Sequence, residues 1–358
     1  MTAALNLDAI NFSRHEEVLV THGHLKVSAF CYASGVKALR VVNSVGWLVL
    51  LPYQGQQIWD VVFHGRRLTM RSMFDEPVDT QDYLGNYGGF LLHCGATAMG
   101  NPGLGDTHAL HGELPNARYQ HAGLSIGTDK FGDYVELNGD YHHTVAFTAN
   151  YVARPMLRIY GDSSRLHMHM KIQNLKNSPM DLMYLAHVNF VPVDDALLVD
   201  TVKPGASHVR VRSKLPEFFV PKAAHSAMIA ALQKEPDLHR HLKAGEAIDP
   251  ELVMGMDFTT DALGWAHSMQ LLPDGSADFI SHKPSELPRG VRWITRTSDQ
   301  DAWGLFLPGT AEADGYTAEK AKGNLVTVAP GECFECSLSF GSLDAGEAAA
   351  MRDQVEQM

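Results

Sequence analysis

Histidine is the most prominent chemically active residue type in this sequence. The chain of 358 residues contains 19 histidines, and imidazole is the side chain best suited to proton transfer near neutral pH. In segment 174–195 a turn at 177–179 precedes a largely apolar strand that carries His187 and Asn189. Because alternate residues of a strand face the same side, these two side chains suit a proton donor beside a group that binds a hydroxyl. The simpler interpretation is a core histidine bonded to a backbone carbonyl.

The glycine-rich segment 85–120 is the second source of polar side chains. Its glycines indicate tight turns and close backbone approach, without the spacing of a phosphate-binding loop. The polar candidates in it are His93, His108, His111, Glu113 and Arg118. They either converge on a hydroxyl-rich ligand or belong to a surface loop with hydrogen-bonded histidines. The spacing of His108, His111 and Glu113 also permits zinc or manganese, but we predict neither a metal nor a cofactor.

A third group of charged side chains lies in segment 304–332. A strand there runs into what we predict to be a long polar loop, which carries Glu312, Asp314, Glu319 and Lys320. A carboxylate at the end of a strand is well placed to act as a general base. The simpler interpretation is a solvated loop with two charged pairs.

The elements that must position these residues are mostly strands. From about 25 to 205 the sequence consists of short β-like runs bounded by Gly, Asn and Pro. Segment 165–173 alternates strictly between polar and apolar residues, as a half-buried antiparallel strand does. Segment 215–250 is rich in Ala, Leu, Lys and Glu and predicts a helical insertion, strands resume after 266, and 344–358 predicts a short terminal helix. We therefore expect one large all-β domain over 1–358, with a sandwich or barrel architecture.

Composition excludes several classes of protein. The net charge of −12 repels phosphate backbones, so we predict no nucleic-acid partner. Apolar runs are too short to span a bilayer, and the N-terminus lacks the pattern of a signal peptide. Cys333 and Cys336 lie three apart in an alternating strand, so their sulfurs diverge and a zinc or redox pair is not expected. With four cysteines and no disulfide pattern, the predicted location is cytoplasmic.

Taken in chain order, these segments resemble the aldose 1-epimerase (galactose mutarotase-like) superfamily, and most closely a poorly characterised branch of it. The most specific match is segment 173–190, which resembles a family strand pair that ends in a histidine. Leu110-His111-Gly112 is similar to the family's sugar-contacting motif, and Pro330-Gly331-Glu332 to its last turn. In one place the chain departs from the family: 306–310 reads Phe-Leu-Pro-Gly-Thr, where the family has a glutamate as general base.

The resemblance implies a large antiparallel β-supersandwich with a sugar cleft, and an isomerase or epimerase that acts on an aldose or a sugar acid. By position His187 takes the role of the general acid, and Glu312 is the nearest carboxylate for the base. The residues that would bind substrate are His93, His108, His111, Arg118 and Asn189. Arg118 favours an anionic sugar, because guanidinium pairs with carboxylate in a fork.

Two other functions fit the same scaffold, because a fold does not fix a function. One is a metal-assisted lyase or hydrolase acting on a sugar derivative, and the other is a non-catalytic carbohydrate-binding protein. In each case the partner is a small carbohydrate, without nucleic acid or membrane, and a homodimer is an open alternative to a monomer.

The histidines at 93, 108, 111 and 187 should approach one cleft together with Arg118. Burial should lower the pKa of His187 while a nearby carboxylate raises it again, leaving a value near neutrality.

Overall fold

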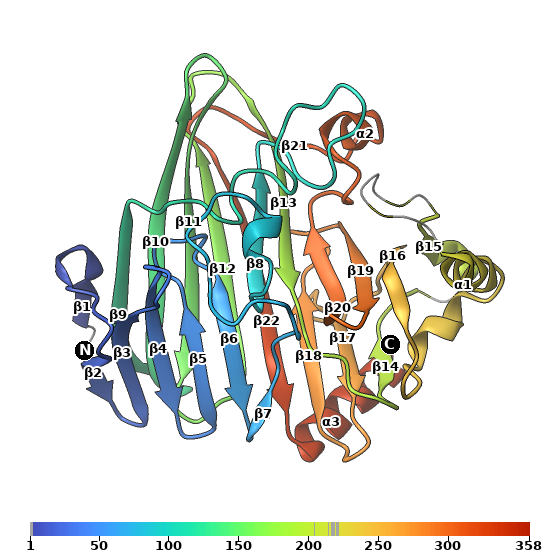
Figure 1. The fold of residues 1–358 in the computed structure, drawn as a ribbon, viewed down its shortest axis with the longest axis horizontal. Coiled ribbons are helices and arrows are strands. Elements are labelled where there is room, and N and C mark those ends of the chain that lie inside the picture. Colours follow the sequence, from blue (N-terminus) through green and yellow to red (C-terminus); the bar gives the residue numbers. More distant parts are fainter. Residues whose placement is uncertain (1–2, 204, 214, 216–218, 220–221) are drawn as a thin grey trace.

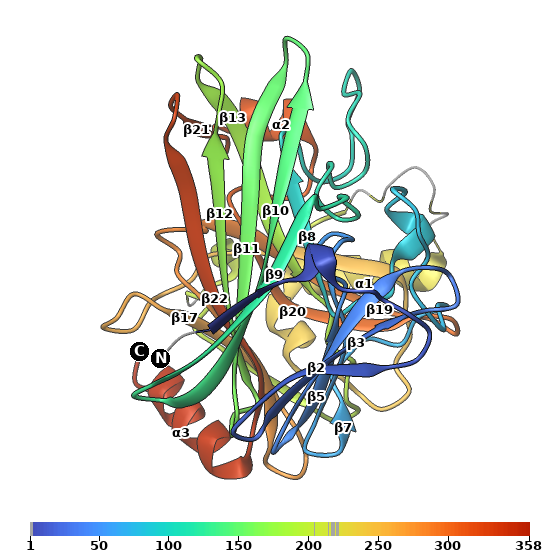
Figure 2. The same ribbon diagram turned by 90° about the vertical axis from the view of Figure 1, so that its left-hand side faces the viewer.

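The chain folds into two large antiparallel sheets. The computed structural model describes all residues except 1–2, 204, 214, 216–218 and 220–221. Nine strands form one sheet, in the order β1 (Ala3–Asn6), β9 (His121–Asp129), β10 (Gly132–Val145), β11 (Ala149–Tyr160), β12 (Arg165–Asn174), β22 (Cys333–Leu343), β18 (Ala277–His282), β17 (Ala266–Leu271) and β14 (Leu197–Asp200). Figure 2 shows this sheet side-on, beside the second one.

The second sheet has 13 strands. Its order is β15 (Val209–Val211), β16 (Ile248–Met256), β19 (Arg289–Arg296), β20 (Asp301–Gly309), β13 (Met180–Val188), β8 (Leu91–Ala96), β6 (Ile58–Phe63), β5 (Gly46–Leu50), β4 (Lys37–Asn43), β3 (Leu25–Cys31) and β2 (Glu17–His22). Two short strands pair off this path, β21 (Val326–Val328) with β13 and β7 (Arg66–Arg67) with β6. Segments far apart in sequence thus meet at its centre, where β13 lies between β8 and β20.

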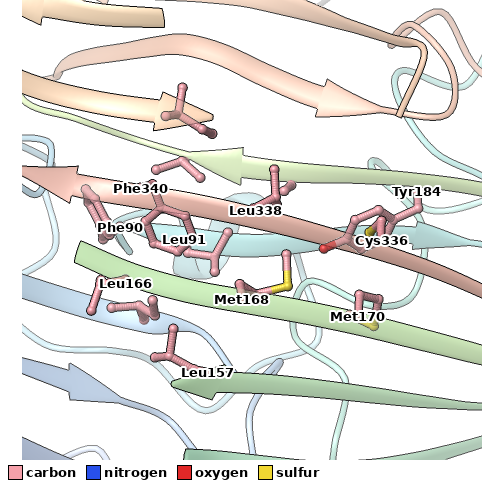
Figure 3. Packing of buried hydrophobic residues seen from close by; sticks show 14 of the residues in the cluster. Phe90, Leu91, Leu157, Leu166, Met168, Met170, Tyr184, Cys336, Leu338 and Phe340 are labelled. Atoms are coloured by element: carbon pink, nitrogen blue, oxygen red, sulfur yellow. The ribbon is translucent and has the colours of Figure 1, made fainter. Parts of the chain in front are cut away.

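The main core lies between the two sheets. Along β12 the residues facing the second sheet are buried and alternate with more exposed ones, which confirms the half-buried strand predicted for 165–173. Figure 3 shows Met168 and Met170 of β12 beside Leu338 and Cys336 of β22. Each fully buried side chain of this kind contributes roughly 1.5–3 kcal/mol. Cys336 is buried and Cys333 half-buried, so the two sulfurs face opposite sides as predicted.

A second apolar cluster covers the other face of the 13-stranded sheet. In β13, Leu182 and Tyr184 belong to the inter-sheet core, whereas Met183 and Leu185 belong to this outer cluster. In β8, Leu91 and Leu92 divide in the same way. The two central strands are therefore buried on both faces, which explains their nearly continuous apolar sequence.

Helices are few and short. Within the predicted insertion at 215–250, whose residues 216–218 and 220–221 lie outside the described part, the chain forms α1 (Ala223–Lys234) and the 3₁₀ turn η4 (Pro236–Arg240). This helix lies at the opposite end of the molecule from the N-terminal strands (Figure 1). The terminal helix is confirmed as α3 (Ala345–Glu356), with a capping box between Asp344 and Glu347. The other 3₁₀ turns are η1 (Leu7–Ala9), η2 (Leu84–Asn86) and η3 (Ala206–His208).

One predicted loop is partly helical. Segment 304–332 contains α2 (Tyr316–Ala321), which begins after Gly315 at a φ of 87°. The carboxylate of Asp106 accepts from the Thr317 backbone N–H at 3.1 Å and so stabilises the first turn. Because this partner is 211 residues away, the local sequence gave no sign of it. The predicted fold class is nonetheless confirmed, and among the described residues no helix is long and apolar enough to cross a membrane.

Candidate functional site

His187 and Asn189 form the centre of the candidate site, at the end of β13. His187 lies opposite Leu92 on the outer face of the sheet and is only 4% exposed. Its Nδ1 lies 2.7 Å from Asn189 Oδ1. The Asn189 amide donates from Nδ2 to the Gly89 carbonyl at 3.0 Å, so Oδ1 must be the acceptor toward the imidazole. The proton of neutral His187 therefore sits on Nδ1, and Nε2 presents a lone pair.

Five rings from four segments surround this position. We call Tyr83, Tyr87, His111, His187 and Trp293 the aromatic cluster. The His187 ring centroid lies 5.3 Å from that of Trp293, 5.6 Å from Tyr87 and 5.7 Å from His111. Tyr83 completes the cluster, 4.7 Å from His111 and 5.0 Å from Tyr87. Trp293 and His111 are half-buried residues, whereas Tyr83, Tyr87 and His187 are buried.

The tyrosine hydroxyl of Tyr87 brings a polar group to the same place. It lies 3.5 Å from His187 Nε2 and donates to Asn189 Oδ1 at 3.4 Å. Burial raises the pKa of Tyr87 well above its usual range, so the hydroxyl keeps its proton at neutral pH. The unprotonated nitrogen of His187 is thus flanked by a neutral donor.

His111 is held in an unusual backbone conformation. Its φ is 59°, in the left-handed region that non-glycine residues seldom adopt. Its N–H donates to the Gly100 carbonyl at 3.0 Å, and its carbonyl accepts from the Gly95 N–H at 3.0 Å. A side chain at Gly112 would lie 2.2 Å from the Ala98 carbonyl oxygen. The glycine of the His-Gly motif is therefore required by close backbone contact.

The imidazole of His111 is uncharged, and one of its two nitrogens lacks a hydrogen bond within the described part of the chain. Burial lowers its pKa well below the usual range, and nearby His187 and Arg212 add to the effect. Its Nδ1 is buried without a hydrogen-bond partner among the described residues. A buried N–H without an acceptor is more costly than a buried lone pair, so we place the His111 proton on Nε2.

The expected near-neutral pKa of His187 is wrong. Burial lowers it to about 4, and the bond to Asn189 opposes this only in part. The prediction assumed a carboxylate beside the ring, whereas the group against Nδ1 is an uncharged amide. At neutral pH His187 is therefore a neutral imidazole.

Glu251 is the carboxylate that contacts the aromatic cluster. Its Oε2 accepts from Trp293 Nε1 at 2.7 Å. The pairing of Val253 with Trp293 between β16 and β19 places Glu251, two residues before Val253, on the same face as the indole. Burial raises the pKa of Glu251, against the opposing effects of Trp293 and Arg212. Glu251 is not among the residues predicted from the sequence, although it is the only acid in the apolar run 250–256.

The structure brings His111, His187 and Asn189 together, but it places His93 elsewhere. His93 lies opposite Ala186 in the strand register and faces the inter-sheet core. There its Nδ1 is 2.7 Å from the Tyr184 hydroxyl, and burial lowers its pKa to about 3. The reason is strand alternation: His93 follows Leu92, which shares the face of His187.

His108 and Arg118 also take other positions. His108 Nδ1 donates to the Ala109 carbonyl at 2.8 Å, and its Nε2 accepts from the Tyr316 N–H at 3.4 Å, so it ties its loop to α2. Arg118 is exposed and pairs with exposed Asp79 at 3.1 Å. Neither side chain contacts the aromatic cluster in the part of the chain that the structure describes.

Glu312 belongs to a charge-balanced group. Its Oε1 pairs with Arg210 at 3.3 Å and its Oε2 with Lys322 at 2.9 Å. The ligand atoms of Glu312, Asp314 and Glu319 lie within 4.8 Å of one another, which could suit a cation. Lys322 Nζ already donates to all three acids, at 2.9, 2.6 and 2.8 Å. We call these three acids, with Arg210, Arg212 and Lys322, the acid–cation cluster.

The alternative metal set of the sequence analysis does not converge. The carboxylate of Glu113 accepts from the Thr97 N–H at 3.0 Å and from the Tyr151 hydroxyl at 2.8 Å. Both nitrogens of His108 are used within its loop and α2. Among the described residues these side chains hold backbone and strands together rather than sharing one centre with His111.

Residues 33–341 match a family described only as a domain of unknown function, DUF4432. The chain belongs to this family. A search of curated proteins finds no match for the DUF4432 chain. Solved structures do resemble it, beginning with a "putative aldose 1-epimerase" from Klebsiella pneumoniae, with 16% identity, a TM-score of 0.84, and coverage of 100% of this chain and 96% of that one.

Two further structures agree on the architecture. A galactose mutarotase-like protein from Clostridium acetobutylicum shares 13% identity over 90% of this chain and 99% of its own, with a TM-score of 0.60. A galactose 1-epimerase from Lactobacillus acidophilus shares 12% identity over 96% and 98% of the two chains, with a TM-score of 0.53. The predicted resemblance of the DUF4432 chain to the galactose mutarotase-like superfamily is thus confirmed at the level of the fold.

Proposed function

We propose that this protein is a carbohydrate isomerase or epimerase that acts on an aldose or a sugar acid by acid–base chemistry at His187. The observation that carries the proposal is the orientation of His187 within the aromatic cluster. Asn189 fixes its Nδ1–H at 2.7 Å, so that Nε2 is free for proton transfer. A fixed tautomer is what a general acid–base histidine requires.

The surrounding groups fit a sugar as the ligand. Binding sites for small molecules combine aromatic surface with a few well-placed polar groups. Here Trp293, Tyr83 and Tyr87 supply the rings. The Tyr87 hydroxyl and His111 Nε2 supply donors for sugar oxygens. Asn189 is engaged with His187 and Gly89, so in this proposal it orients the imidazole.

The names of two similar solved structures support the choice of reaction class in this proposal. Those named as aldose or galactose 1-epimerases point to interconversion at the anomeric carbon as the first reaction to test. The predictions of a small carbohydrate ligand and of a cytoplasmic location remain part of this proposal.

The test is anomer interconversion followed by NMR exchange spectroscopy, on a panel of neutral aldoses and uronic acids. Wild type should accelerate interconversion of at least one sugar, and His187→Ala should slow it by about 10²–10⁴-fold, the usual worth of one general acid–base group. His169→Ala is the matched control, because His169 lies on β12 in the other sheet, beside Glu335.

Three outcomes would contradict the proposal. A His187→Ala variant as active as wild type would make His187 a structural residue. Acceleration lost on chelation and restored by a divalent metal would favour the metal-assisted lyase or hydrolase. Sugar binding without turnover of any panel member would favour a non-catalytic binding protein.

A further inference from the structure

We propose that Glu251 is the second acid–base residue of this site, and that it donates a proton while His187 accepts one. This inference rests on the proposed function and deepens it. It differs from the sequence-based expectation in both respects: the carboxylate lies on β16 instead of following β20, and the imidazole begins the reaction as the base.

The position of Glu251 supports the first part. The Trp293 indole lies between the two groups: its Nε1 donates to Glu251 at 2.7 Å, and its ring centroid is 5.3 Å from that of His187. One aromatic ring thus separates the carboxyl group from the imidazole. Proton donors and acceptors for a pyranose must stand on different sides of the sugar, each within hydrogen-bond reach.

The bonding of the carboxyl group supports it as well. Oε2 of Glu251 is held by the indole N–H, while Oε1 has no hydrogen-bond partner in the described part of the chain. In Glu312, by contrast, each oxygen is engaged by a cation. Both oxygens of Glu312 are thus occupied by cations of the protein itself, whereas Oε1 of Glu251 is open to a ligand, so Glu251 is the better candidate.

The hydrogen bonds around His187 support the second part. Because Asn189 Nδ2 is committed to Gly89, the Asn189 oxygen must receive the His187 proton. Nε2 then lacks a proton and can only accept one. A histidine that acts first as an acid would have to be an imidazolium, and the nearest polar groups, Asn189 and Tyr87, carry no charge that would stabilise it.

The environments of the two groups agree with this distribution of protons. Burial raises the pKa of Glu251, although Trp293, Arg212 and His225 oppose the shift. Burial also lowers the pKa of His187 to about 4. Environments that separate the pKa values of two groups at one site are typical of acid–base pairs.

The reaction balances with these two residues alone. His187 Nε2 takes the proton of the anomeric hydroxyl, and the O–H electron pair forms the C1–O1 double bond. The bond from C1 to the ring oxygen breaks with its pair, and the ring oxygen takes the proton of the Glu251 carboxyl. The open-chain aldehyde rotates about C1–C2. The reverse transfers then close the ring and return both residues to their starting states.

The first experiment compares Glu251→Gln with Glu312→Gln and with Glu335→Gln. Glutamine at 251 keeps an oxygen for the Trp293 N–H but can no longer donate a carboxyl proton. We expect it to slow interconversion by about 10²–10⁴-fold. Glu335 lies on the other sheet with Lys171, so Glu335→Gln should match wild type. A loss with Glu312→Gln and none with Glu251→Gln would overturn the assignment.

The second measurement needs no turnover and no substitution that could impair folding. In wild-type protein labelled with ¹⁵N-histidine, His187 should show a neutral ring with its proton on Nδ1 at pH 7. An imidazolium signal, or a proton on Nε2, would overturn the proposed distribution of protons. If wild type accelerates no sugar, the proposed function fails together with the role of Glu251. If wild type is active and Glu251→Gln equals it, only the present inference fails.

Discussion

The aromatic cluster and the acid–cation cluster lie on the same side of the 13-stranded sheet. They nevertheless favour opposite protonation states of their ionisable groups, the neutral forms in the first and the charged forms in the second. Burial favours the neutral forms of His187 and His111 in the aromatic cluster and of Glu251 beside it. In the acid–cation cluster ion pairs favour the charged forms of Asp314 and Lys322. Burial alone would raise the pKa of Asp314, but Arg212 and Lys322 lower it below its ordinary value.

The difference indicates which region can transfer protons. A charged group held by several partners of opposite sign has little tendency to gain or lose a proton, so it serves to hold segments together. Lys322 in this way joins α2 to the strand end that carries Glu312 and Asp314. A neutral group with a free lone pair or proton is available to a substrate, and among the residues described such groups gather around His187.

The largest expected effect is a loss of folding stability in acid, which should begin at a higher pH for the aromatic cluster than for the acid–cation cluster. The pKa of His187 falls from about 6.5 in an unfolded chain to about 4 in the folded protein. Its contribution to stability is therefore complete above pH 6.5 and is lost as the pH falls through this window toward 4. At about 1.4 kcal/mol per pKa unit, the loss is on the order of 3 kcal/mol.

The measurement is the free energy of unfolding of wild type and of His187→Phe between pH 7 and 4. Phenylalanine keeps a ring but cannot titrate, so the difference between the two proteins should change across this window. The contribution of Asp314, whose folded pKa is lowered, should be lost only below its ordinary value of 3.8. A difference that stays constant from pH 7 to 4 would show that His187 is not buried as a neutral ring.

The second effect concerns the cation of the acid–cation cluster. Lys322→Met keeps the apolar stem but leaves fully buried Glu319 without its bond from the ammonium group. We expect the free energy of unfolding to fall by about 1–3 kcal/mol, as for a buried polar group that loses its partner. The rate of sugar interconversion per folded molecule should not change, because Lys322 does not contact the aromatic cluster.

Lys320→Met is the matched control for this variant. Lys320 is 60% exposed and pairs with Asp181 at 3.4 Å, so its loss should cost less than about 1 kcal/mol. Equal effects of the two substitutions would mean that the buried network around Glu319 is no stronger than an exposed pair. Loss of activity in folded Lys322→Met would mean that the two regions are coupled.

The fold could be predicted from the sequence because it depends on local periodicity. Strand alternation at 165–173 and the capping residues of α3 are visible within a few residues. The pairing of His187 with Asn189 was predictable for the same reason, since a spacing of two in a strand places side chains on one face. Their contact at 2.7 Å agrees with it.

The remainder of the candidate site depends on register between distant strands. Trp293 reaches His187, and Glu251 reaches Trp293, only because β16, β19, β20 and β13 are neighbours in the sheet. Nothing within the sequence of one strand fixes which strand lies beside it. His93 shows the converse problem: it is near the candidate segment in sequence, but alternation along β8 turns it into the inter-sheet core.

The smallest effect tests the expectation that Arg118 recognises an anionic sugar. Arg118 is 64% exposed and its partner Asp79 is 57% exposed, so Arg118→Ala should change the free energy of unfolding by less than about 1 kcal/mol. It should also leave the preference between a uronic acid and its neutral parent unchanged, as measured by isothermal titration calorimetry.

Arg212 is the contrasting position. Its backbone N–H donates to the carbonyl of Val253, on the strand that carries Glu251. Its charge lowers the pKa values of both Glu251 and His111. Any preference for the uronic acid should therefore decline in Arg212→Gln. If it declines in Arg118→Ala instead, the sugar reaches the exposed edge near Asp79, and the aromatic cluster is only part of the binding surface.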